Sequence, residues 1–79
     1  MRILDESSDK SLNRIILYLT LSEAMELRDG LDDLIKNPSN NHTHVSSEDF
    51  NKETTVCVYD VNDLNLFNKR SIDLILNDN

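Results

Sequence analysis

The segment "TLSEAMELRDGLDDLIKNP", residues 20–38, limits the possible folds of this chain most strongly, because it holds both ends of a helix. Thr20 and Glu23 match a capping box, in which each side chain accepts a hydrogen bond from a free backbone amide at the helix start. Residues 37–38, Asn-Pro, end the pattern, since proline cannot continue a helix. Between these ends, one apolar stripe recurs at steps of three and four residues: Ala24, Leu27, Leu31, Leu34 and Ile35. The pattern predicts a long helix with one buried side.

This helix, predicted over residues 20–36, contains the only glycine of the chain, Gly30. In a helix interior, glycine costs about 1 kcal/mol relative to alanine. A residue without a side chain at this position indicates that another segment packs close to the helix there. Leu27 and Leu31 lie on the apolar stripe, and we expect both to be core residues.

Strand patterns occur on both sides of the helix. Residues 13–20, "NRIILYLT", and residues 52–60, "KETTVCVYD", are rich in β-branched and aromatic side chains. Residues 2–4 form a short apolar start that we count as a strand, residues 44–50 favour a short strand or a turn, and residues 39–43 are typical of a loop.

Residues 68–78 predict a short C-terminal helix that is capped by Asn68. The order along the chain is then strand, strand, helix, strand, strand, helix, which is typical of an α+β protein. Short connections favour antiparallel neighbours. The predicted architecture is one domain over residues 1–79, with a small antiparallel sheet of about four strands and the long helix packed on one face.

The charge balance argues against two classes of partner. The chain has 15 acidic and 8 basic residues, which gives a net charge of −7. Nucleic acids and anionic membranes are bound through clusters of Lys and Arg, but the largest basic group is the pair at residues 69–70. The longest apolar run, residues 15–19, is far shorter than the ~20 residues that a membrane span needs. We therefore expect neither nucleic-acid nor membrane binding.

Cys57 is the only cysteine, so the chain cannot form an internal disulfide. This fits a reducing cytoplasm, where we expect the protein to reside. The ten asparagines are typical of an AT-rich coding sequence of bacterial or phage type. Because Cys57 lies in a predicted strand, an inert buried thiol is the expected outcome. A single glycine leaves no phosphate-binding glycine motif, and we predict no cofactor and no enzymatic activity.

The segment "NNHTHVSSED", residues 40–49, carries both histidines of the chain. In an extended segment, residues two apart point the same way, so His42 and His44 can share a ligand, with Glu48 or Asp49 as a third group. The alternative is an ordinary polar loop, because the second pair of Cys or His that structural metal sites use is missing. We predict no bound metal and keep these four residues as candidate binding residues.

Three segments carry a resemblance: "LYLTLSEAMELRDGLDDLIKNP", "HTHVSSEDFNKETTVCVYD" and "NLFNKRSIDLI". Together they are similar to small bacterial proteins with a strand–helix–strand layout. These proteins share a Leu-Thr-x-x-Glu-Ala helix start, a His-rich turn and a lysine-acid approach to the last strand. No activity is attached to the group, so the resemblance implies a fold and not a function.

The predicted function is that of a small non-catalytic binding protein, inhibitor-like or immunity-like, that acts through a protein partner. Glu26, Asp29 and Asp33 would meet a basic surface on that partner and raise the association rate. The alternative is a small-ligand or metal-binding protein that uses the segment from His42 to Asp49.

We also expect a homodimer. The long helix has one apolar stripe and can cover one face of the sheet, whereas Ile16 and Tyr18 are predicted to lie on the other face. An exposed apolar face is normally covered, and twofold pairing is the commonest way.

Overall fold

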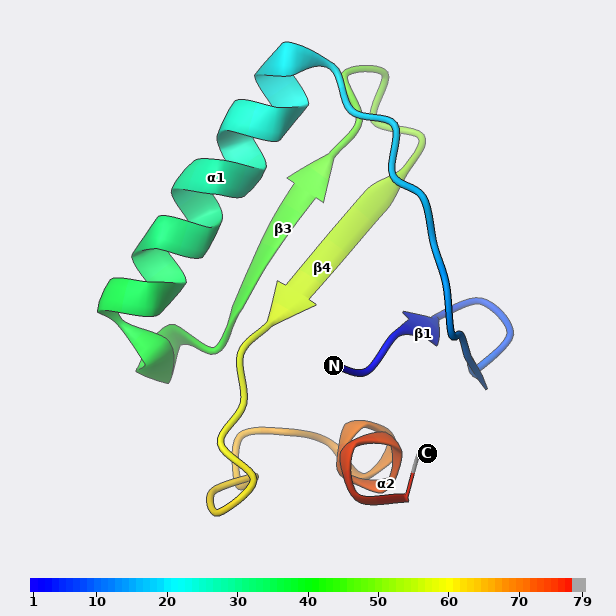
Figure 1. Cartoon of the computed structure of the whole chain (residues 1–79), viewed down its shortest axis with the longest axis vertical. Coiled ribbons are helices and arrows are strands. Elements are labelled where there is room, and N and C mark those ends of the chain that lie inside the picture. The colour runs from blue at the N-terminus through cyan, green and yellow to red at the C-terminus, as the bar shows by residue number, and fades with distance from the viewer. Residues whose placement is uncertain (78–79) are drawn as a thin grey trace. The chain divides into compact units, whose positions relative to one another are not determined.

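The computed structural model describes residues 1–77, in which the chain forms two compact units (Figure 1). Unit 1 combines Met1–Leu17 with the chain from Asp60 onward, and unit 2 is continuous from Tyr18 to Tyr59. The elements, in chain order, are β1 (Leu4–Asp5), β2 (Lys10–Ser11), α1 (Leu21–Lys36), the 3-10 turn η1 (Pro38–Asn40), β3 (His42–Ser46), β4 (Glu53–Cys57) and α2 (Lys69–Asn77). The prediction of a single domain stays a prediction.

The α1 helix of unit 2 begins and ends as its sequence predicts. The Glu23 amide donates to Thr20 Oγ1 at 3.2 Å, and the Thr20 amide donates to Glu23 Oε1 at 2.9 Å, which completes the capping box. At the other end, the Asn37 amide donates to the Asp33 carbonyl at 2.8 Å, and Pro38 starts the following turn. The predicted helix boundaries are confirmed.

Strands β3 and β4 form an antiparallel hairpin in unit 2, with Thr43 opposite Val56 and Val45 opposite Thr54. These four residues share one face, because side chains alternate along a strand. Val45 is buried and the other three are half-buried. The opposite face, which carries the two histidines, is largely exposed.

Helix α1 lies beside β3 (Figure 1). The two elements approach closely at Gly30, where a Cβ atom would stand 2.5 Å from Thr43 Oγ1 and 3.2 Å from Thr43 Cβ. The predicted close neighbour of Gly30 is therefore Thr43. The buried residues of unit 2 are Leu34, Val45 and the carboxylate-bearing Glu23.

Leu27 and Leu31 are half-buried, so the expectation that both are core residues is wrong in degree. The helix turns the side bearing Glu23, Gly30 and Leu34 toward β3, and this places Leu31 on its flank.

Unit 1 holds its N-terminal hairpin and the C-terminal helix together through arginines. Arg2 donates from Nε and Nη2 to the Ile75 carbonyl at 3.2 and 3.0 Å, which places a cation at the carbonyl end of α2. Arg70 Nη1 lies 3.0 Å from Asp9 Oδ1. Asn68 Oδ1 accepts from the Ser71 amide at 2.9 Å, so the predicted cap of α2 is confirmed. Asp78, the last residue of that predicted helix, lies outside the described residues.

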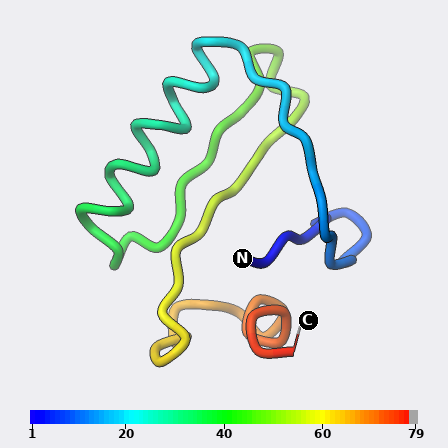
Figure 2. The backbone as a smooth tube through the Cα atoms, in the orientation of Figure 1, coloured from blue at the N-terminus to red at the C-terminus, as the bar shows by residue number. Residues whose placement is uncertain are grey.

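The α+β class is confirmed, with two helices and four strands in residues 1–77, but the sheet is not the predicted one. The strands form two separate two-stranded antiparallel sheets, β1–β2 and β3–β4. Residues 13–20, predicted as a strong strand, run extended into α1 without joining a sheet (Figure 2). Strand propensity alone does not provide a neighbouring strand, and without one a segment cannot form the backbone hydrogen bonds of a sheet.

The hairpin also begins earlier than predicted, since β3 covers His42–Ser46 where the sequence favoured residues 44–50. The residues after Ser46 form a turn in which Phe50 has φ 59°, a left-handed conformation. Among the helices of residues 1–77, none is long and apolar enough to cross a membrane.

Candidate functional site

His42 and His44 project from the same face of β3, as their spacing predicts. Their ring centroids are 5.0 Å apart, with the ring planes at 69°, an edge-to-face arrangement. Both side chains are exposed. The strand thus presents two imidazoles side by side to solvent.

The carboxylate that approaches His44 comes from β4 and not from the predicted acidic pair. Nδ1 of His44 lies 2.7 Å from Thr55 Oγ1 and 3.0 Å from Glu53 Oε1. His42 Nδ1 lies 2.6 Å from Asn41 Oδ1, so its contact is with its chain neighbour. The hairpin register, which brings Glu53 opposite Ser46, explains this choice of partner.

Glu48 and Asp49 instead build the turn between the two strands. Asp49 Oδ1 accepts from Ser47 Oγ at 2.5 Å and from the Asn51 amide at 3.1 Å. The Ser47 hydroxyl is the main reason that the pKa of Asp49 lies below its ordinary value. The structure therefore brings the two histidines together, while the Asp49 carboxylate bonds within the turn and Glu48 is held through its backbone amide. In the part of the chain that the structure describes, no group of three or more His, Cys, Asp or Glu side chains is arranged to hold a metal ion.

Cys57 stands opposite His42 in the hairpin. Its side chain is exposed in part, and partial burial raises the pKa of the thiol. A raised pKa keeps the thiol protonated near neutral pH, whereas a nucleophile needs the thiolate. The expectation of a buried cysteine is wrong, but the geometry gives no activation.

Glu23 has a second role that the sequence pattern did not show. Its Oε2 accepts from the Glu48 amide at 2.9 Å, 25 residues away, while Oε1 holds the Thr20 amide. These two amides, that of Thr20 first, hold the pKa of Glu23 below its ordinary value. One carboxylate thus ties the start of α1 to the turn after β3.

The predicted acidic face of α1 is exposed along its whole length. Glu26, Asp29 and Asp33 follow each other at steps of three and four residues and lie on one side of the helix. Asp29 pairs at 3.0 Å with its neighbour Arg28, and both side chains are about two-thirds exposed. Within residues 1–77, no basic side chain forms an ion pair with Glu26 or Asp33.

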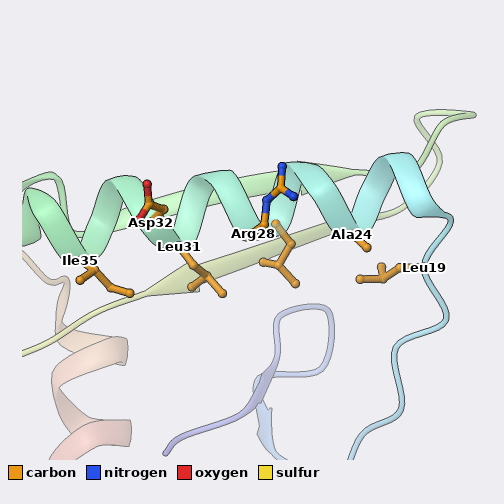
Figure 3. A pocket seen from close by; sticks show the side chains of 7 residues that line it. Leu19, Ala24, Arg28, Leu31, Asp32 and Ile35 are labelled. Carbon is orange, nitrogen blue, oxygen red and sulfur yellow. The ribbon is translucent and has the colours of Figure 1, made fainter.

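Next to the side of α1 that meets β3 lies an open apolar groove, which the sequence analysis did not foresee. It has a volume of about 510 Å³ and is lined by Leu19, Ala24, Leu27, Arg28, Leu31, Asp32 and Ile35. Ala24, Leu31 and Ile35 point the same way from the helix, and Leu19 lies at the N-terminal end of their row (Figure 3). The sequence feature that could have indicated this groove is the wide apolar stripe of α1. Half of it packs on β3, and the other half lines this groove.

Comparisons with protein-family models, with curated proteins and with solved structures give no match. The resemblance to small bacterial strand–helix–strand proteins stays a prediction, and function is argued from the surfaces above.

Proposed function

We propose that this chain is a non-catalytic binding protein that docks a partner protein along α1. The observation that carries the proposal is the groove, an almost wholly apolar strip bordered by Arg28 and Asp32. An apolar centre with a charged rim is the usual anatomy of a protein–protein interface. Ile35 is 74% exposed at one end of the strip, so it is accessible to a partner.

The charge around the groove indicates the chemistry of that partner. Asp32 lies at its border on α1 together with Arg28, and the whole chain carries a net charge of −7. A partner that presents apolar side chains flanked by Lys or Arg would match both features. An amphipathic helix with a leucine stripe and lysine borders is the simplest such element. Opposite charge would mainly raise the association rate and make it sensitive to salt.

The test uses two helical peptides that share one leucine stripe and differ only in their borders, lysine in one and glutamate in the other. We expect the lysine peptide to shift the NMR signals of Ala24, Leu31 and Ile35 and the glutamate peptide to shift them little. The substitution Ile35→Lys should weaken binding about tenfold or more, because a buried isoleucine contributes about 1.5–3 kcal/mol.

His42→Ala is the matched control, since His42 is exposed on a different element and lies outside the groove. It should leave peptide binding unchanged. Shifts that map to β3 instead of α1, or equal binding of both peptides, would refute the proposed surface.

The alternative, ligand or metal binding through residues 42–49, has one observation in its favour, the paired imidazoles of His42 and His44. It has less support, because Asp49 and the Glu48 backbone are committed to the turn. A ligand at 100 times its dissociation constant adds about 2.7 kcal/mol of stability, which a thermal-shift experiment with zinc detects easily. We expect no shift; a shift that His44→Ala abolishes would favour the alternative.

A further inference from the structure

Within residues 1–77, the extended segment before α1, residues 14–19, carries five consecutive exposed apolar side chains. Its side chains Ile15, Ile16, Leu17, Tyr18 and Leu19 are exposed by 51, 76, 47, 89 and 38%. The segment has neither glycine nor proline, and its residue types favour strands. Yet it belongs to no sheet in the described structure.

The backbone of this segment is equally without partners. Among residues 1–77, the amides and carbonyls of residues 14–19 make no hydrogen bond, whereas the preceding Leu12 amide donates to the Ile3 carbonyl. A row of unpaired peptide groups beside strand-forming side chains is a template for pairing with another strand. We propose that residues 14–19 pair antiparallel with the same residues of a second copy of this chain, giving a twofold dimer.

A second copy is the occupant that fits the charge of the chain. Residues 10–22 contain no acidic residue, although the chain has 15. Two copies with a net charge of −7 each repel one another least where acidic groups are missing. In an antiparallel pair, the two Arg14 side chains stand at opposite ends, roughly 17 Å apart, beyond the Debye length of about 8 Å at physiological salt.

The size of the surface fits a weak dimer. The five exposed side chains offer on the order of 500 Å² of apolar area per copy. Edge-to-edge pairing covers only part of this area, so two copies bury less than the roughly 1,000 Å² of a stable specific interface, and the dimer is weak. Antiparallel strands are self-complementary about a twofold axis, so both copies contribute the same residues to the contact.

Sedimentation equilibrium of the full chain tests the proposal. From low to high micromolar concentration, we expect the mass to rise from 9.1 kDa toward twice that value. Added salt should strengthen the dimer by screening the net charge, whereas it should weaken docking of a basic partner on α1. The dimer is therefore tested independently of the proposed function.

Two variants and one control locate the contact. Ile16→Lys and Tyr18→Lys should each keep the chain monomeric, and because both residues are largely exposed, neither should disturb folding. Leu66→Lys is the matched control, since Leu66 is 69% exposed and lies elsewhere in the chain, and it should still dimerise. A wild-type chain that stays monomeric at the highest concentration would overturn the proposal, as would dimers of both segment variants.

Amide hydrogen exchange of residues 15–19 is a second, independent measurement of the proposed pairing. In the proposed dimer, these amides become protected as the concentration rises. Protection that is the same at every concentration, together with a monomeric mass, would mean that the segment pairs within its own chain and would refute the dimer.

Discussion

Gly30 gives the sharpest test of the packing between α1 and β3, because two opposing effects of known size meet there. In an isolated helix, Gly30→Ala should stabilise by about 1 kcal/mol through helix propensity. In this structure, the new Cβ would stand 2.5 Å from Thr43 Oγ1, 3.0 Å from Thr43 Cγ2 and 3.2 Å from Thr43 Cβ. Rotating the Thr43 side chain does not move its Cβ, so helix and strand must separate slightly.

Overpacking of this kind costs about 1–3 kcal/mol. Once the propensity gain is taken into account, Gly30→Ala should lower the free energy of unfolding by roughly 0–2 kcal/mol. Thr43→Ala removes two of the three close atoms. In that background the same substitution should become neutral or stabilising, by up to about 1 kcal/mol. The two substitutions are therefore coupled, with a reversal of sign.

Urea denaturation followed by far-UV circular dichroism measures all four chains of this double-mutant cycle. A coupling free energy of about 1–3 kcal/mol is expected. If Gly30→Ala stabilised by the same 1 kcal/mol or so in both backgrounds, propensity alone would act, and the close approach of Thr43 would be refuted.

Leu34→Ala should lower the free energy of unfolding by about 2–5 kcal/mol, because Leu34 is 2% exposed. Asp33→Ala, on the exposed side of α1, should change it by less than about 0.5 kcal/mol. Comparable losses for both variants in urea denaturation would contradict the assignment of the two helix sides. Hydrogen bonds to its carboxylate lower the folded-state pKa of Glu23, so its contribution is present above the ordinary value of 4.5 and is lost as the pH falls through the lower folded pKa. Glu23→Gln should accordingly lower the melting temperature at pH 7 and have little effect near pH 3, and an equal effect at both values would count against the two amide contacts. Asn68→Ala should destabilise α2 by about 1 kcal/mol through loss of its cap, seen as faster amide exchange at Ser71; unchanged exchange would mean that the cap contributes nothing.

Local signals predicted the helices well because their causes lie within a few residues of each other. Thr20 and Glu23 satisfy each other across three positions, and Asn68 caps the amide of Ser71 in the same way. Even Gly30 could be interpreted, since its cost in a helix requires a compensating contact. The identity of that contact, Thr43, depends on the path of the chain and had no local signal.

The candidate site was predicted less well because it depends on strand register. The pairing of His42 with His44 follows from alternation along one strand. The carboxylate near His44 depends on where the hairpin turns, because the turn sets which residues of β4 face those of β3. Glu48 and Asp49 are close to the histidines in sequence, but the turn takes them elsewhere.

The two proposed surfaces meet at Leu19, which ends the exposed segment and also lines the groove of α1. If residues 14–19 form a strand, alternation places Ile15, Leu17 and Leu19 on one face. Leu19 then belongs both to the dimer strand and to the groove lining, so we expect dimerisation to hold one lining residue in place for a partner. By reciprocity, a partner on α1 would favour the dimer by the same free energy. Ile16→Lys, which alters no groove residue, should then weaken binding of the lysine-bordered peptide at high protein concentration and leave it unchanged at low concentration.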